Sequence, residues 1–342
     1  MKKIILILLL IVLVGAGISA WIILGPGTGF SQDKKALYIS SKAATRKAVL
    51  DSLEKNNLVS NITAFDFLAT RMKYWDRIRP GKYEIKEGSS LLNIVRTLRN
   101  GNQSPVDLVI TKIRTREDFA RMVGRLFETD STEMMQFFGN ADSMRLYNAT
   151  PETALWQVLP DTYTYFWNSD PATIYQKLVK ESSSFWNEER KQKASQLSLT
   201  PVEVHTLASI IEEETTLNRE KDTIASVYLN RLRIGMPLQA DPTLKFATKE
   251  FGLKRIAGAI LKVESPYNTY VNKGLPPGPI CTPSRTTIDK VLSPATTPFL
   301  YFVAKPGLGG HLFSASYEEH LRKRDDYLAA DKKRREQQNS NQ

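Results

Sequence analysis

Residues 207–216 read Leu-Ala-Ser-Ile-Ile-Glu-Glu-Glu-Thr-Thr, an apolar segment with helical spacing that ends in three consecutive carboxylates. No Lys or Arg lies within one turn on the N-terminal side, although surface helices usually pair acids with bases three or four residues away. A carboxylate held against apolar neighbours has its charged form disfavoured, so its pKa rises and it can carry a proton near neutral pH. General acids of this kind protonate the ether oxygen of a glycosidic bond. The segment therefore predicts a helix of an enzyme that cuts sugar chains.

The spacing does not decide which of the three acids would do this work. In a helix of about 3.6 residues per turn the apolar stripe passes through Glu214, which makes it the deepest acid. Glu212 borders the stripe beside Ala208 and Ser209, whose small side chains would leave room for a ligand over it. Glu213 is expected to face solvent. The whole cluster could also serve structural ion pairs, which perturb carboxylates as well.

The N-terminus predicts a membrane anchor. Lys2 and Lys3 precede an uncharged apolar stretch over residues 4–24, long enough to span a bilayer at roughly 20 residues. The two lysines place the N-terminus in the cytoplasm and the rest of the chain outside it, by the positive-inside rule. A cleaved signal peptide is the alternative, but its apolar core would be shorter, and Ile18 is too bulky for the expected cleavage box. We therefore expect an uncleaved single-pass anchor.

Composition narrows the partners. The formal net charge of +11 suits an anionic neighbourhood such as phospholipid headgroups or cell-wall polymer. Nucleic acid is not expected as a partner of a chain that its own anchor exports. Cys281 is the sole cysteine, which excludes an internal disulfide. His311 and His320 lack a third ligand with metal-site spacing, so neither a metal site nor a cofactor is expected, and these histidines would make structural hydrogen bonds or line a cleft.

The pattern along the chain predicts an α+β protein with five regions. After a strand over 36–39 and two helices, the stretch 80–101 reads PGKYEIKEGSSLLNIVRTLRNG, a strand followed by a helix with Ser89 as N-cap and Gly101 at its end. This part resembles a LysM-type glycan-binding module, although the same pattern serves many small α+β domains as plain core. The expected regions are a cytoplasmic tip and anchor over 1–24, a flexible linker over 25–35, the LysM-like module over 36–110, a catalytic domain over 111–330 and a disordered charged tail over 331–342.

Residues 159–167, which read LPDTYTYFW, interrupt the helical pattern that follows the module. We expect a turn here, with four aromatic side chains close together. Aromatic rings can stack on sugar faces, but a cluster of this density is more often core.

Several motifs follow one another in an order that resembles a known family. They are LPDTY (159–163), LASIIEEET (207–215), ASVYLNRLRIGMPLQADPT (225–243), SPYNTY (265–270), GLPPGPI (274–280) and PFLYFVAKPGLGGHLFSASYEEH (298–320). Together with the single anchor they resemble the MltG/YceG-like endolytic murein (lytic) transglycosylases. The resemblance covers nearly the whole chain and is sharpest from about residue 200 to 320.

The resemblance implies an enzyme that cleaves MurNAc–GlcNAc bonds of nascent peptidoglycan strands without water and leaves 1,6-anhydro-MurNAc ends. It also implies that Glu212 is the single general acid and base, which first protonates the glycosidic oxygen and then takes the proton of the C6 hydroxyl as that oxygen attacks C1. Glu213 stands where lysozyme-like enzymes usually have Ser, so a separate α/β catalytic domain is implied in place of the lysozyme superfold.

The resemblance and the chemistry of the side chains also predict substrate-binding residues. These are Glu214, Gln239, Asp241, Tyr267, Asn268, Thr269 and Tyr270. Amide, carboxylate and hydroxyl groups can hydrogen-bond sugar hydroxyls and N-acetyl groups, and tyrosines can stack on pyranose rings. The residues 267–270 could equally form an ordered turn, since Asn and Pro are common in loops. Glu214 is expected to pair with Arg231 and so to order the site.

Two other functions stay open. A muramidase-type hydrolase would use Glu212 with Asp241 as a second carboxylate. A non-catalytic scaffold of the cell-wall machinery would bind glycan and use its acids only structurally. The resemblance implies peptidoglycan glycan strands as substrate, peptidoglycan synthases as partners, and a location in the bacterial cytoplasmic (inner) membrane with the catalytic domain in the periplasm or extracytoplasmic space.

Overall fold

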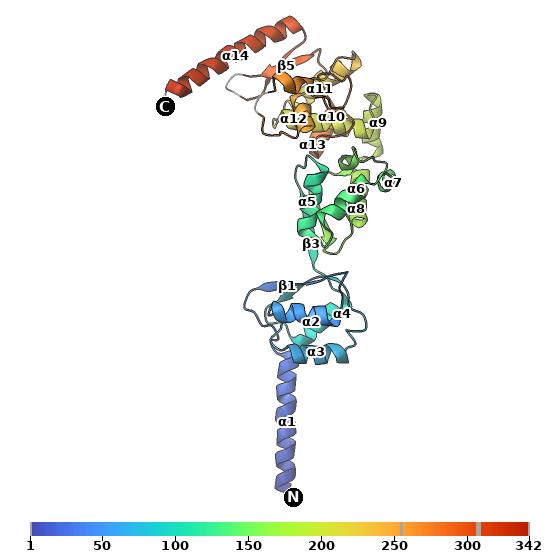
Figure 1. Ribbon diagram of the computed structural model, residues 1–342, viewed down its shortest axis with the longest axis vertical. Helices are drawn as coiled ribbons and strands as arrows, with labels where there is room; N and C mark the ends of the chain where they lie inside the picture. The colour runs from blue at the N-terminus through green and yellow to red at the C-terminus, as the bar shows by residue number, and fades with distance from the viewer. Residues whose placement is uncertain (1, 254–255, 306–308, 341–342) are drawn as a thin grey trace. The chain divides into compact units, whose positions relative to one another are not determined.

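The computed structural model describes residues 2–253, 256–305 and 309–340, and these form two compact units (Figure 1). Unit 1 contains the residues up to Leu108 together with the segments 123–130 and 164–171. Unit 2 contains 109–122, 131–163 and the residues from Ala172 onward. The two later segments of unit 1 lie inside the range that the sequence assigned to a single catalytic domain, so the division along the chain is more interleaved than expected.

Helix α1 (Lys2–Leu24) is apolar along its whole length, and none of its residues is buried in the protein. It is long and apolar enough to cross a membrane. Of the helices that the structure describes, only α1 has this character. The helix therefore fits the predicted single-pass membrane anchor.

The rest of unit 1 follows the predicted order of elements. These are β1 (Lys34–Ile39), α2 (Arg46–Lys55), α3 (Ile62–Arg71), β2 (Gly81–Lys86) and α4 (Leu91–Asn100). β1 and β2 are antiparallel, with Leu37 opposite Tyr83, and both side chains are fully buried. The N-cap of α4 is Ser90, whose side chain accepts a hydrogen bond from the Asn93 N–H, so the assignment to Ser89 was off by one residue. Gly101 ends the helix in the left-handed conformation, as expected.

The segment before β1 is packed against unit 1 and does not form the flexible linker predicted over 25–35. The Gly27 N–H donates to the Ser89 carbonyl at 3.0 Å, and the Gly27 carbonyl accepts from the Ser60 N–H at 2.9 Å. A Cβ atom on Gly27 would lie 2.8 Å from the backbone nitrogen of Leu91. Glycine is therefore required here by a close approach of two backbone segments.

β4 (Asp161–Phe166) is a strand that the sequence analysis missed. It pairs with β3 (Pro105–Ile110), which was predicted. Tyr163 and Tyr165 are buried and alternate with exposed threonines, which is the period of a strand. The reading of the aromatic cluster as core is confirmed for these two tyrosines. Besides β4, the chain between β3 and Thr200 forms helices. They are α5 (Arg116–Leu126), α6 (Ser131–Gly139), α7 (Ala141–Arg145), the 3-10 helix η1 (Ala154–Gln157), α8 (Pro171–Phe185) and α9 (Glu188–Gln196).

Helix α10 (Pro201–Glu214) forms the centre of unit 2. Thr200 and Glu203 make a capping box at its start, and every residue from 204 to 211 is buried. Such all-round burial is typical of a helix enclosed by its neighbours. Those neighbours are α11 (Lys221–Arg233), α12 (Asp241–Thr248) and α13 (Arg285–Leu292), which surround α10 in Figure 1. The short 3-10 helix η2 (Gly258–Lys262) follows α12 and contacts it.

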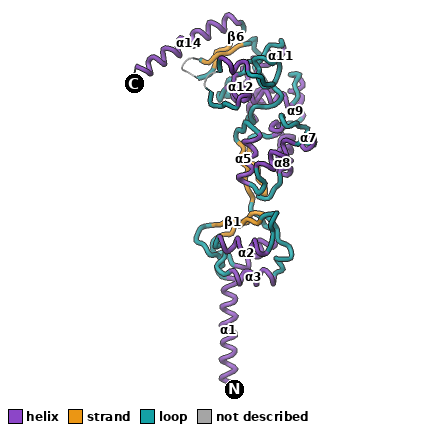
Figure 2. Tube along the Cα trace, in the orientation of Figure 1, coloured by secondary structure: helices purple, strands orange, loops and turns teal. Residues whose placement is uncertain are grey.

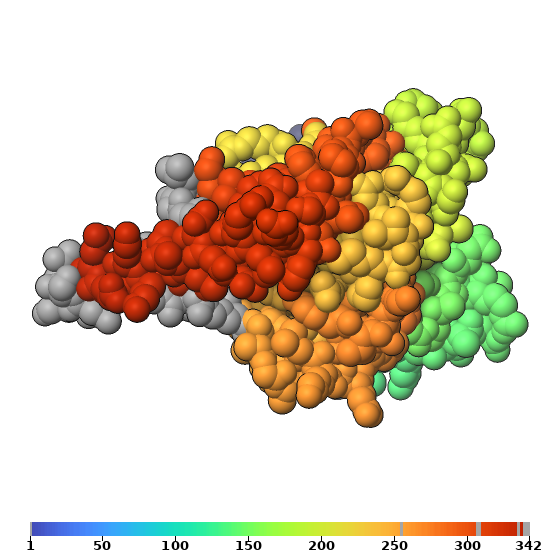
Figure 3. All heavy atoms as spheres, turned by 90° about the horizontal axis from the view of Figure 1, so that it is seen from above, coloured from blue at the N-terminus to red at the C-terminus, as the bar shows by residue number. Residues whose placement is uncertain are grey.

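The C-terminal part of unit 2 is a hairpin followed by a long helix. β5 (Tyr301–Ala304) and β6 (His311–Ser314) are antiparallel, and they appear as the orange pair near α14 (Tyr317–Ser340) in Figure 2. α14 contacts both strands, and in Figure 3 its red spheres extend away from the rest of unit 2. The helix continues through most of the tail that was predicted to be disordered. Ion pairs four residues apart, such as Glu319 with Lys323 at 2.7 Å, support its first turns. Residues 341–342 of that tail lie outside the described residues.

The described chain is thus an α+β protein, as the sequence predicted: helices enclose most of both units, and the strands form small two-stranded sheets. For function, the important consequence is that the three acids lie at the C-terminal end of α10, directly after its buried residues 204–211.

Candidate active site

Glu212, Glu213 and Glu214 end α10, and each carboxylate meets a different environment. Because successive residues of a helix are rotated by about 100°, the three side chains leave α10 in three directions. Their partners therefore decide which acid can act.

Glu212 is held as a carboxylate by a buried cation and two hydroxyl groups. Lys221 on α11 is almost fully buried, and its Nζ donates to Glu212 Oε2 at 2.9 Å. Ser284 donates to the same oxygen at 3.2 Å, and Thr287 on α13 donates to it as well. Burial opposes ionisation of Glu212, but the hydrogen bonds from Thr287 and Lys221 outweigh it and lower the pKa below its ordinary value. This environment favours the ionised form of Glu212, whereas the sequence predicted a protonatable carboxylate at this position.

Glu213 does not face solvent as predicted. Lys112 donates to it at 3.0 Å, and the Arg114 guanidinium binds both carboxylate oxygens at 3.1 and 2.9 Å. Burial raises its pKa, but the hydrogen bonds from Arg114 and Lys112 prevail, and the net shift is downward. Glu213 is thus a structural anchor between α10 and the segment after β3.

Glu214 is the acid without a cationic partner. In the described part of the chain it makes no ion pair, and the Tyr228 hydroxyl donates to its Oε1 at 2.6 Å. The predicted pairing with Arg231 is not found, because that guanidinium donates to the backbone carbonyls of Leu300 at 2.6 Å and Leu238 at 2.7 Å. Burial raises the pKa of Glu214 to about 7; the Tyr228 hydrogen bond opposes this shift and the nearby charge of Asp241 adds to it.

Glu214 also lines a cavity of about 180 Å³ in unit 2. The other lining residues are Tyr228, Arg231, Leu238, Gln239, Asp241, Tyr270 and Phe302. Three further residues predicted to bind substrate, Gln239, Asp241 and Tyr270, thus meet Glu214 in one place. The Tyr270 hydroxyl donates to Asp241 Oδ1 at 2.5 Å, which joins α12 to the loop after it. The cavity offers one protonatable acid surrounded by polar groups, the arrangement that general acid catalysis needs.

Asn268 and Thr269 do not line this cavity. Both are buried, and their polar atoms bind the protein itself. The Asn268 amide donates to two backbone carbonyls of the preceding loop at 3.1 and 2.9 Å. Thr269 Oγ1 accepts from the Ala240 N–H at 3.0 Å and lies 2.8 Å from the Thr243 hydroxyl. These two residues shape the loop beside the cavity, while Tyr267 lines a separate hollow.

The small side chain of Ser209, which precedes the acids, leaves room for another segment of the protein and not for a ligand. Ser209 Oγ accepts from the Ile280 N–H at 3.0 Å, and the Ser209 carbonyl lies 3.4 Å from the Cys281 sulfur. The segment 280–281 therefore packs against the face of α10 that the sequence analysis left open for a ligand beside Glu212. Cys281 itself is buried and free.

The two histidines of the C-terminal motif have structural contacts. His311 Nδ1 lies 3.0 Å from Glu220 Oε2, and the His320 ring stacks on Tyr301 with centroids 5.2 Å apart. Within the described ranges, no group of three or more His, Cys, Asp or Glu is placed to hold a metal ion.

Sequence reasoning missed Tyr228 and Lys221, the two α11 residues that contact the acids. Tyr228 and Arg231 are three residues apart on one helix, so they lie on the same face, and both line the cavity. That spacing within the stretch 225–243 was the available signal. Nothing local to Lys221 predicts that its ammonium group is buried.

Comparisons with known proteins agree with one another. The sequence profile of the YceG-like family matches residues 37–326. An endolytic murein transglycosylase of Bacillus subtilis (strain 168) is 29% identical over 301 residues, which make up 83% of this chain and 82% of the relative. One from Streptococcus pneumoniae serotype 2 (strain D39) is 27% identical over 79% of this chain, which spans 54% of that longer relative. A 2.6 Å crystal structure of the yceG-like protein lmo1499 from Listeria monocytogenes matches with a TM-score of 0.57 and 27% identity, over 85% of this chain and 99% of that one.

Proposed function

The chain belongs to the YceG-like family, and we propose that it is a membrane-anchored endolytic murein transglycosylase. Relatives from two bacteria carry that name, and one of them matches over most of both chains. The observation that carries the chemistry is Glu214, a carboxyl with a pKa of about 7 that faces a cavity lined by polar groups. The proposed substrate is the MurNAc–GlcNAc bond within glycan strands, and the proposed product carries a 1,6-anhydro-MurNAc end.

In the proposed reaction, the protonated Glu214 donates its proton to the glycosidic oxygen, and the bond from that oxygen to C1 of MurNAc breaks. The C6 hydroxyl of the same sugar then attacks C1, and its proton passes to the Glu214 carboxylate. The acid thus returns to its starting state, and no water is consumed. A pKa near the operating pH lets one carboxyl serve in both steps.

The groups around Glu214 have supporting tasks in this proposal. Tyr228 holds the carboxyl in one orientation through its hydrogen bond. Gln239 and Asp241 face the same cavity and can hydrogen-bond sugar hydroxyls or the N-acetyl group. Tyr270 fixes Asp241 in place. The backbone of Gln239 is left-handed, with φ of 51°, and its N–H is held by the Thr269 carbonyl at 3.0 Å, so the loop presents this side chain in a fixed position.

We assign the acid role to Glu214 in preference to Glu212, the residue predicted from the sequence. A general acid must hold a proton before it can give one, and the hydrogen bonds from Thr287 and Lys221 favour the ionised form of Glu212. Glu212 also lies beside Thr287 and Ser284, away from the residues of the cavity. The Glu212 assignment remains an alternative, and the variants described in the Discussion separate the two.

One observation favours a second candidate reaction. Glu214 and Asp241 line the same cavity, so a two-carboxylate muramidase would use this pair in place of the predicted Glu212 and Asp241. In that reaction Asp241 would activate water or attack C1, and the product would have a reducing end. The hydrogen bond from Tyr270 occupies one oxygen of Asp241 and disfavours this role.

The test is the chemical nature of the new strand ends. Protein starting at Gly25 would be incubated with uncrosslinked glycan strands, and the products analysed by mass spectrometry. Anhydro-MurNAc ends, retained by Asp241→Asn at a reduced rate, are expected. Reducing ends that disappear in Asp241→Asn would establish the hydrolase. Folded wild-type protein that cleaves nothing would favour the non-catalytic scaffold.

The location and partners are also proposals. We place α1 in the bacterial cytoplasmic membrane with Lys2 and Lys3 in the cytoplasm, and both units in the extracytoplasmic space. There, residues 36–110 would act as the LysM-like glycan-binding module and 111–330 would carry the catalytic residues. Peptidoglycan synthases, which make the strands, are the proposed protein partners.

A further inference from the structure

A second hollow in unit 2 has no task in the proposed reaction. Its volume is about 170 Å³. Its walls combine the charged residues Arg116, Glu152 and Lys249 with the rings of Phe246 and Tyr267. Positive and negative side chains around an apolar floor suit a peptide, because a peptide can carry carboxylate and ammonium groups as well as aliphatic side chains. We call this space the side hollow.

The side hollow lies next to the catalytic cavity, because two segments reach both. Helix α12 presents Asp241 to the cavity and Phe246 to the side hollow. The loop that follows presents Tyr270 to the cavity and Tyr267 to the side hollow, where its ring contacts Phe246 with centroids 4.7 Å apart.

A small hollow of about 40 Å³ lies between them. It shares Arg114 and Phe246 with the side hollow, and it is also lined by Glu213 and Pro242, the chain neighbours of the cavity residues Glu214 and Asp241. The small hollow therefore adjoins the side hollow, and its walls include the chain neighbours of two cavity residues.

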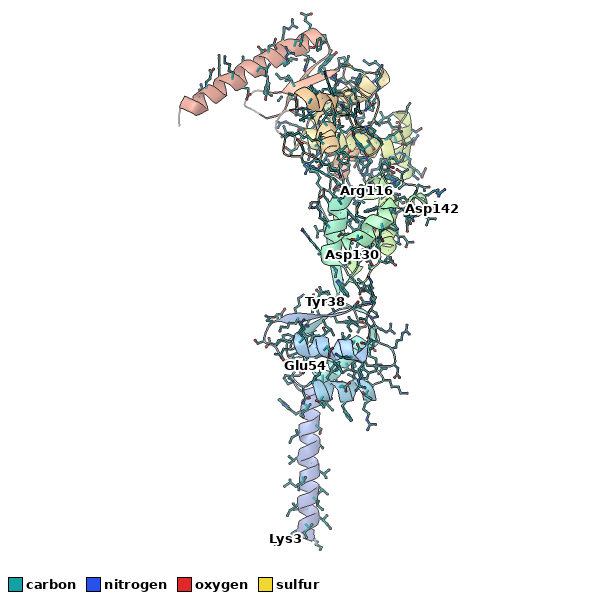
Figure 4. The ribbon with its side chains drawn as sticks, in the orientation of Figure 1. Lys3, Tyr38, Glu54, Arg116, Asp130 and Asp142 are labelled. Atoms are coloured by element: carbon teal, nitrogen blue, oxygen red, sulfur yellow. The ribbon has the colours of Figure 1, made fainter. Side chains whose placement is uncertain are left out.

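The charges of the side hollow are only partly used within the protein. Arg114 binds Glu213, and Lys249 lies 3.6 Å from Glu117. Among the described residues, by contrast, Arg116 has no ion-pair partner within 4.0 Å; it is the first residue of α5 and is labelled in Figure 4. Within the described ranges Glu152 has no ion-pair partner at that distance either, although hydrogen bonds from its own backbone N–H and from Thr150, together with the charge of Arg116, lower its pKa.

Arg116 and Glu152 face the same tyrosine. Burial raises the pKa of Tyr267 to about 12, the charge of Glu152 adds to this shift and the charge of Arg116 opposes it. Gly278 closes the wall, since a Cβ atom there would lie 2.6 Å from the Glu152 carbonyl and 3.4 Å from the Tyr267 hydroxyl. The segment 274–280 thus passes close to the backbone of Glu152 and to the Tyr267 hydroxyl on one side of the hollow.

We propose that the side hollow binds the peptide stem of the glycan strand, with a stem carboxylate on Arg116 and a stem ammonium group on Glu152. This rests on the proposed function, because the stem hangs from the same MurNAc unit whose bond is cut. From Asp241 to Thr248, the residue before Lys249, α12 rises about 10.5 Å at 1.5 Å per residue. An extended peptide covers that distance in roughly three residues of about 3.3–3.6 Å. A stem residue about three positions along would then come to the side hollow, and a diamino acid with a free amine and a carboxylate would suit Glu152 and Arg116.

The test compares two substrates of one strand preparation. One keeps its stems, and in the other an amidase has removed them from the MurNAc lactyl group. Wild type is expected to cleave the stem-bearing strands with kcat/KM at least about tenfold higher, the effect of one charge-assisted hydrogen bond. Arg116→Gln and Glu152→Gln should each lower this ratio severalfold, mainly through KM. Arg121→Gln, an exposed arginine of the same helix, should keep the wild-type ratio.

Equal rates of wild type on the two substrates would overturn the proposal, as would Arg116→Gln lowering both rates equally. A binding measurement separates this failure from failure of the proposed function. Glu214→Gln would be titrated calorimetrically with a disaccharide that carries a stem, and with the same disaccharide without it. If wild type cleaves neither strand but the stem strengthens binding through Arg116, the proposal of a stem-binding site is supported and the proposed reaction is contradicted. If the stem adds no affinity, the proposal of a stem-binding site is contradicted as well.

Discussion

Three neighbouring glutamates of one helix differ only in what surrounds them. Lys221 and two hydroxyl groups fix the charge of Glu212, and Lys112 with Arg114 fixes that of Glu213. Glu214 has the Tyr228 hydroxyl alone and keeps its proton to about pH 7. In the proposed reaction Glu214 is therefore the acid, and the environments of the three carboxylates separate their pKa values.

The pH dependence of cleavage should report Glu214. The acid must be protonated in the free enzyme, and its pKa is raised to about 7, so kcat/KM should be level below this value and fall about tenfold per pH unit above it. Initial rates on uncrosslinked strands between pH 5 and 9 measure this directly. A rate that stays level up to pH 9, or that falls already near pH 4.5, would show that another group supplies the proton.

The two glutamine variants should shift stability in opposite directions. The folded-state pKa of Glu214 is raised, so its carboxyl favours folding below its unfolded pKa near 4.5 and this contribution is lost as pH rises through about 7. Glu214→Gln should therefore be more stable than wild type at pH 8, by about 1–3 kcal/mol, with no advantage at pH 4.

Glu212→Gln should instead be less stable at pH 8, by about 2–4 kcal/mol, because it leaves the buried Lys221 without its counter-charge. Urea unfolding at the two pH values measures both variants against wild type. The assignment of environments would be wrong if Glu212→Gln were the more stable of the two at pH 8.

At this scale the sequence predicted part of the site. Helical spacing identified Glu214 as the deepest acid, and Gln239, Asp241 and Tyr270, which the resemblance singled out, line one cavity with it. The charge states could not be predicted, because the groups that fix them are distant along the chain. Thr287 is 75 residues from Glu212 and Arg114 is 99 residues from Glu213, and no local pattern joins them.

The start of α12 positions Asp241, the carboxylate that shares the cavity with Glu214. Its Ala240 N-cap makes no side-chain cap hydrogen bond, and the Ala240 N–H is satisfied from outside the helix by Thr269 Oγ1. Thr243 in the first turn donates to the Ala240 carbonyl at 2.7 Å and contacts the same threonine. Thr269 therefore ties the loop over 267–270 to the helix that presents Asp241.

Thr269→Val should destabilise the protein by about 1–3 kcal/mol, since it keeps the side-chain shape but leaves the buried Ala240 N–H without an acceptor. The start of α12 should also shift, so kcat/KM should fall although Thr269 contacts no substrate. Thr248→Val is the matched control, because that hydroxyl bonds only to carbonyls of its own helix. Urea unfolding and initial rates measure the pair, and equal behaviour of the two variants would remove this role from Thr269.

Most elements were predictable from spacing and caps, as in the strand–helix–helix–strand order of unit 1. The strand β4 was not predicted because its many aromatic residues suggested a turn with an aromatic cluster, although buried and exposed residues alternate along it. Ser209 was misjudged for a tertiary reason: its small side chain accommodates the segment 280–281, which the sequence places 71 residues away.

For the molecule as a whole, the stretch between α1 and β1 is packed against the rest of unit 1. Gly27, Thr28 and Gly29 each take part in a hydrogen bond with unit 1, the last through Asn57. The composition of this stretch is typical of a flexible linker, and only the packed structure shows that its glycines serve close contact.

A fragment that starts at Gln32 should therefore be less stable than one that starts at Gly25. The shorter fragment loses these hydrogen bonds, worth about 2–4 kcal/mol in sum, and its melting temperature should fall by several degrees. Calorimetry of the two fragments measures the difference. Equal melting temperatures would mean that the stretch behaves as the linker predicted from its composition.

The interleaving of the two units also lay beyond the sequence. The segments 123–130 and 164–171 join unit 1 although they lie between parts of unit 2. A change of composition marks a boundary only where the chain passes once from one unit to the next. The anchor helix and the α+β class, by contrast, follow from composition and periodicity alone.

The most direct test of the account compares Glu214→Gln with Glu212→Gln in the protein that starts at Gly25, with mass-spectrometric counting of new strand ends. Circular dichroism would first establish that both variants are folded at the assay temperature. We expect Glu214→Gln to lose cleavage by at least about a thousandfold, within the range for removal of a general acid, and Glu212→Gln to retain activity within about tenfold of wild type. A folded Glu212→Gln without activity beside an active Glu214→Gln would contradict the assignment and restore Glu212 as the catalytic acid.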